Sequence, residues 1–306
     1  MHPMPALIAL FLLVALSACD RGQPPNPVPA QPVGATKSPR WTAVEELVRK
    51  KDLPGAYAAL EVLRVEGRPD AELTLRLAEV RRLQSEPVKA ILLLREGLAA
   101  EPQAHQLVVP LASLYLQVGD NKLAREVLEG GRAAGASSYE LNLLLGQTYG
   151  RLELNDLALR EFEGAEALGA KPHIVLYNRA LVLGQMKKHD EAIRALEEVV
   201  RVDPEWPAGR RELARAILDS LPKERAPVER ALDMLVGVQE KLAEDWRLHE
   251  SIGDAWLLLG DYDAALQAYT EALRFGKNPK SVEDRYRVAA TKKKERETSA
   301  VPPPAK

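Results

Sequence analysis

Histidine and cysteine, two residue types that often carry out acid–base or metal chemistry, are scarce in this 306-residue sequence. The five histidines are His2, His105, His173, His189 and His249. No cysteine, aspartate or glutamate recurs beside them at the spacing of metal ligands, so we predict no metal site and interpret the histidines as surface polar residues. Cys19 is the only cysteine, which rules out a disulfide within the chain.

Motifs that activate a nucleophile or hold a phosphate are also missing from the sequence. No Gly-x-Ser-x-Gly turn occurs. Gly276-Lys277 lacks both the upstream glycine and the following serine or threonine of a phosphate-binding loop. Most carboxylates stand four residues from a lysine or arginine, or on the outer faces of expected helices. We therefore predict that the chain is not an enzyme and binds neither a cofactor nor a small-molecule substrate.

The charge of the chain does not favour nucleic acid as a partner. The formal net charge is −2, with both signs mixed along the sequence, whereas nucleic-acid binding requires a basic surface. The one local basic cluster is the run 292–296. We interpret it as the solvent-facing side of a helix, with contact to anionic lipid as the alternative.

The sequence does contain a repeat. Seven alanines follow one another at one fixed interval, except that the interval before the sixth is five residues longer. Each is followed four positions later by a large apolar residue, and five are preceded at twelve positions by another small residue. The alanines are Ala56, Ala90, Ala124, Ala158, Ala192, Ala231 and Ala265, and the large residues are Leu60, Leu94, Leu128, Phe162, Leu196, Leu235 and Tyr269. A fixed period of this length is typical of helical solenoids, which usually bind partners.

Residues 139–172 indicate how each repeat folds. Gly146 and Tyr149 fall on one face of a first helix, and Ala158 and Phe162 fall on one face of a second. The small residues allow the two helix axes to approach to about 8–10 Å, and the large ones fill the space between neighbouring hairpins. Because one hairpin cannot bury both of its faces, we expect the stack to be the folding unit.

This pattern resembles the tetratricopeptide repeat. The residues that carry the resemblance are Leu145, Gly146, Tyr149, Ala158, Phe162, Ala165 and Pro172, and later Gly253, Trp256, Gly260, Ala265, Tyr269 and Ala272. The resemblance implies an all-α fold, a right-handed superhelical solenoid of helix hairpins over 41–279. We expect repeats at 37–70 (degenerate), 71–104, 105–138, 139–172, 173–206, 207–245 and 246–279, then a capping helix at 280–297 and a disordered tail at 298–306.

Three prolines predict local departures from the regular repeat. Pro110 lies inside a first helix, where it removes one N–H and crowds the preceding turn, so we expect a late helix start or a kink. The repeat at 207–245 has five extra residues, which Pro222 and Pro227 bracket. We expect these residues to form a protruding loop at 220–227 between the two helices of that repeat.

The beginning of the chain is predicted to be a secretory signal, because the apolar run from Pro5 to Ala18 is too short to span a bilayer comfortably. The run ends in Leu16-Ser17-Ala18-Cys19, which resembles the lipobox of bacterial lipoproteins. The resemblance implies that residues 1–18 are removed and that Cys19 carries palmitate-type lipid. The alternative is a plain signal peptide followed by an incidental cysteine. Residues 19–40 are rich in proline and are expected to form a disordered tether.

A lipid on Cys19 would place the chain in the bacterial cell envelope, anchored to a membrane and facing the periplasm. Asp20 follows the cysteine directly. An aspartate in this place resembles the signal that retains enterobacterial lipoproteins at the inner membrane. We therefore favour the inner membrane, with the outer membrane as the alternative.

In tetratricopeptide proteins the first helix of each repeat lines a concave groove. The equivalent positions here, called the groove residues, are Val109, Ser113, Leu116, Leu143, Gln147, Arg151, Tyr177, Asn178, Leu181, Gln185, Arg211 and Arg215. Gly184 leaves room for a partner's backbone, and farther along Glu250 and Asp254 add negative charge. Such a lining suits an extended peptide or an amphipathic helix with apolar anchors and an acidic end. The alternative is that Leu143, Tyr177 and Leu181 only pack between hairpins.

The resulting functional prediction is a non-enzymatic scaffold that holds an envelope protein through its groove and a membrane through Cys19. The chain resembles tetratricopeptide lipoproteins of the pilotin type and others that assist type IV pilus secretins, outer-membrane assembly or cell-wall synthesis. The class that clamps a C-terminal carboxylate with groove lysines and asparagines is not expected, since only Asn178 fits it. The alternative is a structural homo-oligomer whose groove is filled by its own Pro-rich segment or by a second copy.

Overall fold

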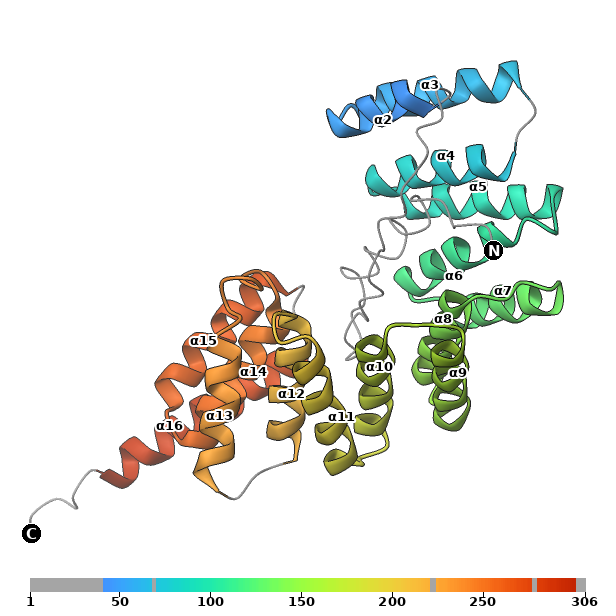
Figure 1. Cartoon of the computed structure of the whole chain (residues 1–306). Coiled ribbons are helices and arrows are strands. Elements are labelled where there is room, and N and C mark those ends of the chain that lie inside the picture. The colour runs from blue at the N-terminus through green and yellow to red at the C-terminus, as the bar shows by residue number, and fades with distance from the viewer. Residues whose placement is uncertain (1–40, 68–69, 221–223, 277–279, 301–306) are drawn as a thin grey trace, which may run out of the picture. The chain divides into compact units, whose positions relative to one another are not determined.

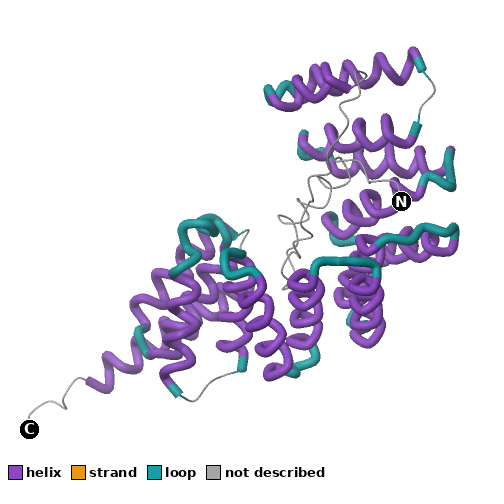
Figure 2. The backbone as a smooth tube through the Cα atoms, viewed as in Figure 1, coloured by secondary structure: helices purple, strands orange, loops and turns teal. Residues whose placement is uncertain are grey.

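The computed structural model describes residues 41–67, 70–220, 224–276 and 280–300, and all regular structure in these ranges is helical (Figures 1 and 2). The described chain divides into two compact units, with the boundary between Val175 and Leu176. The predicted signal peptide, Cys19, Asp20 and the Pro-rich tether lie outside the described residues. Within those residues no helix combines the length and the apolar character needed to cross a membrane.

The first unit consists of helix hairpins, and a turn of three residues joins the two helices of each hairpin. The hairpins are α2 (Thr42–Arg49) with α3 (Leu53–Glu66), α4 (Ala71–Leu83) with α5 (Pro87–Ala100), α6 (Val108–Gln117) with α7 (Asn121–Ala133) and α8 (Tyr139–Arg151) with α9 (Asn155–Ala167). These bounds confirm the all-α hairpin architecture that the fixed period of the alanines predicts.

The second unit continues the same arrangement, and its boundary falls inside its first helix. Its helices are α10 (Pro172–Gln185) with α11 (His189–Val202), α12 (Pro207–Asp219) with α13 (Arg225–Val236), α14 (Trp246–Leu259) with α15 (Tyr262–Phe275), and finally the single helix α16 (Lys280–Ala300). Each first helix is therefore followed by a second helix, and the last helix has no second helix in the described chain.

The six hairpin turns that the structure describes completely share one backbone device. One residue of the turn adopts the left-handed conformation that ends many helices. These residues are Lys51, Ser85, Gly119, Glu153, Lys187 and Gly260, with φ between 59° and 85°. Where the next residue is an aspartate, its carboxylate accepts a hydrogen bond from the free backbone N–H three residues farther along the chain. Asp120, for example, accepts from the N–H of Leu123 at 3.1 Å.

The repeated alanines and their large partners form the core of the hairpins. All seven alanines and all seven large residues are at most 1% exposed. At Gly146 an added Cβ would lie 2.3 Å from Cε1 of Phe162, and at Gly253 it would lie 2.4 Å from Cε1 of Tyr269. The small residue on the first helix is therefore required by the aromatic ring that packs against it from the second helix, as the sequence pattern predicts.

The late helix start expected at Pro110 is confirmed. A 3₁₀ turn at His105–Leu107 precedes α6, which begins only at Val108. Pro110 therefore lies in the first turn of α6, where backbone N–H groups have no partner within the helix. The missing donor of proline costs little at this place, so the helix is shortened to 10 residues instead of being broken.

The loop predicted at 220–227 between two prolines ends earlier than expected. Helix α13 begins at Arg225, so Pro227 lies in the first turn of the helix and not in a loop. Relative to Ala231, α13 begins and ends earlier than α11 does relative to Ala192. Residues 237–244 follow as turns. The extra residues are thus distributed over both sides of α13, and Pro222 lies outside the described residues.

The capping helix α16 covers the end of the second unit. Val282 and Ala289 are buried in one cluster with Ala265, Tyr269 and Ala272 of α15. The helix runs to Ala300, so residues 298–300 belong to it and not to the disordered tail that the sequence suggested. The prolines at 302–304 lie outside the described residues.

Candidate functional site

The groove residues of the first unit lie on α6 and α8, and most of them have little exposed surface. Val109, Ser113, Leu116, Leu143 and Gln147 are buried. Arg151, at the end of α8, is half-buried, and its guanidinium donates a hydrogen bond to the carbonyl oxygen of Leu116 at 2.9 Å. Arg151 therefore ties two successive first helices together, and a partner reaches this part of the groove mainly through that side chain.

The groove residues of the second unit lie on α10 and α12 and differ more in exposure. Tyr177, Asn178, Leu181 and Arg211 are buried, Arg215 is half-buried, and Gln185 is exposed. The ring of Tyr177 packs against the ring of Trp206, with centroids 4.8 Å apart.

The burial of Leu143 and Tyr177 corrects their expected role as direct contacts. Both are 0% exposed, and Leu181 belongs to the same core cluster as Tyr177. They pack between helices, which is the alternative that the sequence left open. Partner binding by the groove as a whole stays a prediction, and the groove residues that a partner can reach are Arg151, Gln185 and Arg215.

A buried cluster of charges connects α12 to the beginning of α14. Glu212, which has no exposed surface, accepts hydrogen bonds from Arg211 at 2.9 Å and from Arg215 at 2.8 Å. Arg211 also pairs with Asp245, the residue that caps α14, and Arg215 donates to Asp219 at 2.6 Å. The cluster joins residues from two successive repeats.

The pKa values of this cluster keep it charged. Burial alone would raise the pKa of Glu212, but the charges of Arg215 and Arg211 offset it, so the pKa is lowered. Burial likewise opposes the charge of Arg211, yet Glu212 and Asp245 raise its pKa above the usual value. The positive charge that the sequence assigned to the groove is therefore neutralised inside the protein.

The negative charges expected farther along the groove are also paired internally. Arg285 of α16 forms ion pairs with both Glu250 and Asp254 of α14. Ser281 donates to Glu250 at 2.9 Å, and Tyr269 donates to Asp254 at 2.7 Å. The capping helix thus takes the place that a charged ligand would occupy at this end of the second unit.

The positions that remain accessible lie at the ends of successive first helices in the second unit, and we call them the end-turn surface. It consists of Gly184, Gln185, Arg215, Asp219 and Leu258. Gln185 and Asp219 occupy equivalent positions in two successive repeats. An added Cβ at Gly184 would meet nothing within 4 Å. This surface combines apolar and polar groups beside open space.

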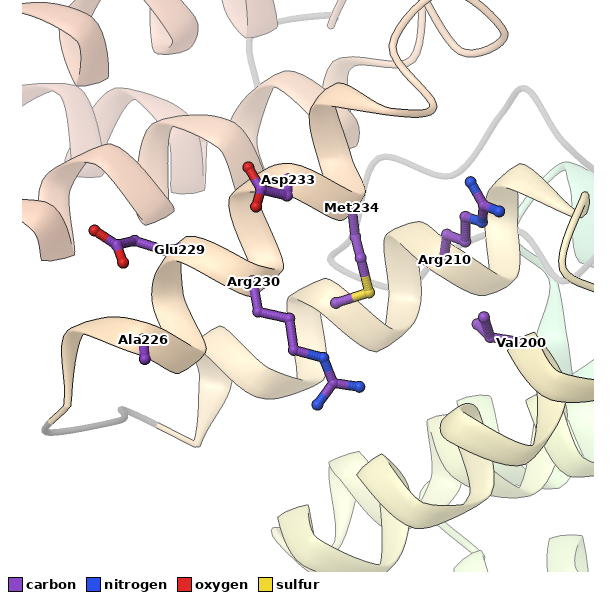
Figure 3. Close-up of a pocket in the computed structure, with 7 residues that line it drawn as sticks. All are labelled: Val200, Arg210, Ala226, Glu229, Arg230, Asp233 and Met234. Atoms are coloured by element: carbon purple, nitrogen blue, oxygen red, sulfur yellow. The ribbon is translucent and has the colours of Figure 1, made fainter.

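A shallow pocket of about 620 Å³ lies between α11, α12 and α13 of the second unit, and the sequence did not indicate it (Figure 3). Val200 of α11 and Arg210 of α12 line it together with Ala226, Glu229, Arg230, Asp233 and Met234 of α13. Two of its cations are already paired, Arg230 with Glu197 at 3.1 Å and Arg210 with Glu205 at 3.8 Å. The lining is mixed in charge and does not select a ligand.

The described residues hold no group of three or more histidines, cysteines or carboxylates that could bind a metal. One histidine nevertheless differs from its interpretation as a surface residue. His249 is buried, its Nε2 lies 2.7 Å from the carbonyl oxygen of Ala243, and its ring stacks on Phe275 at 5.5 Å. It holds the long connection before α14 against the end of α15, which is a structural role.

Comparison with known proteins finds tetratricopeptide repeats in part of the chain. Models of the tetratricopeptide repeat match residues 174–205 and 225–281. A comparison with curated proteins gives no match.

Solved structures support the same fold. A tetratricopeptide repeat protein from Parabacteroides merdae is similar over 82% of this chain and 97% of its own, with a TM-score of 0.69 and 16% identity. PilW, a widely conserved type IV pilus biogenesis factor, is similar over 69% of this chain and 97% of its own, with a TM-score of 0.58 and 17% identity. A chain of the APC/C hetero-tetramer Cut9-Hcn1 is similar over 80% of this chain and 48% of its own, with a TM-score of 0.66 and 17% identity. At these identities the likeness shows the fold.

Proposed function

We propose that this chain, a tetratricopeptide-repeat protein, is a non-enzymatic scaffold that binds a peptide or a helix of a partner protein in the bacterial envelope. Stacked repeats make an interaction scaffold, because successive first helices present one continuous face. The observation that carries the proposal is the burial of the same alanine and large-residue pair in every hairpin from α2–α3 to α14–α15. This pair maintains the stack, so the accessible positions are available for recognition.

The end-turn surface is our candidate for the partner contact. Leu258 offers apolar area, and Gln185, Arg215 and Asp219 offer hydrogen-bonding groups. A partner segment with apolar residues on one side and polar residues on the other matches this arrangement. The open space at Gly184 would admit the backbone of such a segment.

The location in the cell is part of the proposal and rests on the sequence. Leu16-Ser17-Ala18-Cys19 supports removal of residues 1–18 and lipid attachment at Cys19, and Asp20 favours the inner membrane over the outer. If the Pro-rich residues 19–40 act as an extended tether at ~3.1 Å per residue, they would reach up to roughly 70 Å from the membrane. The scaffold would then work in the periplasm.

Type IV pilus assembly is one candidate among envelope pathways. PilW, which has a similar fold, is a type IV pilus biogenesis factor. Outer-membrane assembly and cell-wall synthesis are the alternatives, since likeness of fold does not choose among them.

Photo-crosslinking in cells tests the proposal. A photoreactive residue replaces Gln185 on the end-turn surface, and a matched control replaces Arg160, which is equally exposed on the outer side of α9. We expect one dominant envelope protein in the adduct from position 185 and not from position 160. Identical adducts from both positions would contradict the proposed surface, and an adduct with the chain itself would favour the homo-oligomer.

A further inference from the structure

Five apolar residues lie at two successive hairpin turns of the first unit, and we call them the first-unit patch. It consists of Val118, Leu123, Leu152, Leu154 and Leu157. Val118 is 45% exposed, Leu123 37%, Leu154 39% and Leu157 38%, while Leu152 is half-buried. Scattered single apolar residues are normal on a surface, but a contiguous group marks an interaction site.

The two turns that carry the patch lie side by side. Helix α8 packs against both α6 and α7 (Figure 1). The guanidinium of Arg151, at the end of α8, donates a hydrogen bond to the carbonyl oxygen of Leu116 near the end of α6, at 2.9 Å. Arg151 directly precedes Leu152, and Leu116 stands two residues before Val118. The hydrogen bond therefore holds the two turns together where the patch begins.

The register of the repeats sets the patch residues level with one another. Val118 and Leu152 occupy the same position of successive repeats, and so do Leu123 and Leu157. The two preceding hairpins do not continue the patch. At the same two positions α4–α5 holds Gln84 and Lys89, and α2–α3 holds Lys50 and Gly55.

The charges that border the patch indicate which kind of occupant it suits. Glu153 and Asp156 are exposed beside Leu154, and Lys122 is exposed beside Leu123. None of these three charged side chains forms an ion pair with another described residue. Because their sum is negative, the border does not favour an anionic membrane. An uncharged apolar segment suits the patch better.

This chain contains such a segment. Residues 22–36 include five prolines and no charged residue. Proline-rich sequences favour the polyproline II conformation, in which every third residue falls on the same face. One of the three faces of this segment is apolar throughout and consists of Pro24, Pro27, Ala30 and Val33.

The spacing along this face matches the spacing of the hairpins. Three residues of polyproline II extend by ~9.3 Å, and helices that pack together lie about 8–10 Å apart. Residues three apart in the segment can therefore contact the same position on successive hairpins.

The segment is also long enough to reach the patch from the point where the described chain begins. Trp41 precedes α2 at the open end of the first hairpin, two hairpins before α6–α7. Two packing distances of about 10 Å and, at right angles to them, one helix length of about 20 Å place the turn of α6–α7 roughly 30 Å from Trp41. The eleven residue steps from Ala30 to Trp41 extend by roughly 34 Å.

We propose that residues 24–33 dock on the first-unit patch in an extended conformation, with Ala30 against hairpin α6–α7 and Pro27 against hairpin α8–α9. The proline rings fix φ in advance, so docking costs little conformational entropy. The contact uses other residues than the end-turn surface. Only residues 19–23 then connect the docked segment to Cys19, and they extend by roughly 15 Å. Docking would thus hold the first unit near the membrane; this consequence rests on the proposed lipid anchor, whereas the docking does not.

Photo-crosslinking within the full chain tests the register of the docked segment. A photoreactive residue replaces Leu123 in one version of the protein and Leu157 in another, and tandem mass spectrometry locates the adducts. We expect adducts centred on Ala30 from position 123 and on Pro27 from position 157, a shift of three residues. A different shift, adducts spread evenly over residues 22–40, or no adduct in this segment overturns the proposal.

Two neighbouring substitutions test the apolar face of the segment. Ala30→Glu puts a charge on the face that contacts the patch, and Gln31→Glu puts the same charge on another face as a matched control. We expect Ala30→Glu to lower the yield of the adduct from position 123 about tenfold, and Gln31→Glu to leave it unchanged. Equal yields from the two variants contradict the assigned face.

The same crosslink in a mixture of isotopically light and heavy purified chains identifies the chain that supplies the segment. We expect adducts that join two parts of one chain. Adducts that mainly join light to heavy chains assign the patch to a second copy, and a main adduct with another protein in cells assigns it to a partner. Either result overturns docking within one chain.

Discussion

At the scale of single residues, two buried glutamates show how neighbouring cations decide the consequence of burying a charge. Glu79 of α4 has one arginine partner, Arg82, at 2.7 and 2.5 Å. Burial raises the pKa of Glu79, and the single arginine does not offset it. Glu212 of α12 has two arginine partners, and its pKa is lowered in spite of complete burial. Two cations outweigh desolvation where one does not.

These opposite shifts predict opposite dependences of stability on pH. The lowered pKa of Glu212 contributes stability that is present above the ordinary carboxyl range and is lost as pH falls through the folded value. The raised pKa of Glu79 contributes stability that is present at low pH and is lost as pH rises through the folded value. Glu212→Gln should destabilise by about 3–5 kcal/mol at pH 7, because it leaves buried arginines short of a partner.

Hydrogen exchange from pH 7 down to about pH 3, read separately for α4 and α12, measures both effects, because the loss at Glu212 occurs below the ordinary carboxyl range. As pH falls, the protection of α12 in the wild type should approach that of Glu212→Gln. The protection of α4 in the wild type should instead rise relative to Glu79→Gln. Slopes of the same sign for the two variants would contradict the assigned pKa directions.

The buried charge cluster also shows that a prediction made from one repeat at a time misses ion pairs between successive repeats. Arg211 was assigned to the groove because its position within one repeat faces inward. Its partner Asp245 stands one regular period of the repeat later in the chain. A search for opposite charges one period apart would have found this pair. Burial of Tyr177 and Leu143 was harder to predict, because groove and packing positions share the same apolar residue types.

At the scale of elements, the sequence predicts best where packing leaves little choice. The repeated pairs of an alanine and a large residue predict every hairpin correctly, because the packing between the two helices restricts side-chain size. At Gly146, for example, a larger side chain would collide with Phe162. Pro110 gave the late start of α6, because proline affects the backbone directly. Pro227 led to a wrong prediction of a loop, because proline is tolerated in the first turn of a helix as well as in a loop.

The capping helix yields a prediction about an element that has only one packed side. Val282 is fully buried in the cluster with Tyr269, whereas Val288 on the same helix is exposed. Val282→Asp buries an unpaired charge and should destabilise the packing of α16 on α14 and α15 by about 2–4 kcal/mol. Hydrogen exchange of α15 should accelerate as a result.

Val288→Asp is the matched control, because it introduces the same charge on the exposed side of α16. A surface change of this kind should alter stability by no more than about 0.5 kcal/mol. If the two variants accelerate exchange in α15 equally, then α16 does not stabilise the end of the second unit through Val282.

At the scale of the whole molecule, a repeat protein distributes its tasks along the chain. Each hairpin contacts mainly its neighbours, so changes at one end need not reach the other. The end-turn surface and the packed side of the capping helix consist of different residues, so each can be altered separately.

The proposed anchor precedes every described element, so its removal should leave the folded hairpins intact. Cys19→Ser removes the only thiol that could accept lipid. We expect the protein to move from the membrane fraction to the soluble fraction, or to retain residues 1–18, because processing of lipoproteins depends on that cysteine. Fractionation of cells followed by mass spectrometry of the N-terminus distinguishes these two results.

A second substitution separates anchoring from sorting between the two membranes. Asp20→Ser keeps Cys19 and should therefore preserve attachment, but it should shift the protein from the inner toward the outer membrane. A chain with Cys19→Ser that stays tightly attached after normal processing would show that lipid on this residue is not the anchor. In that case the scaffold would have to reach the membrane through a partner, and the adduct from position 185 would be the first candidate for it.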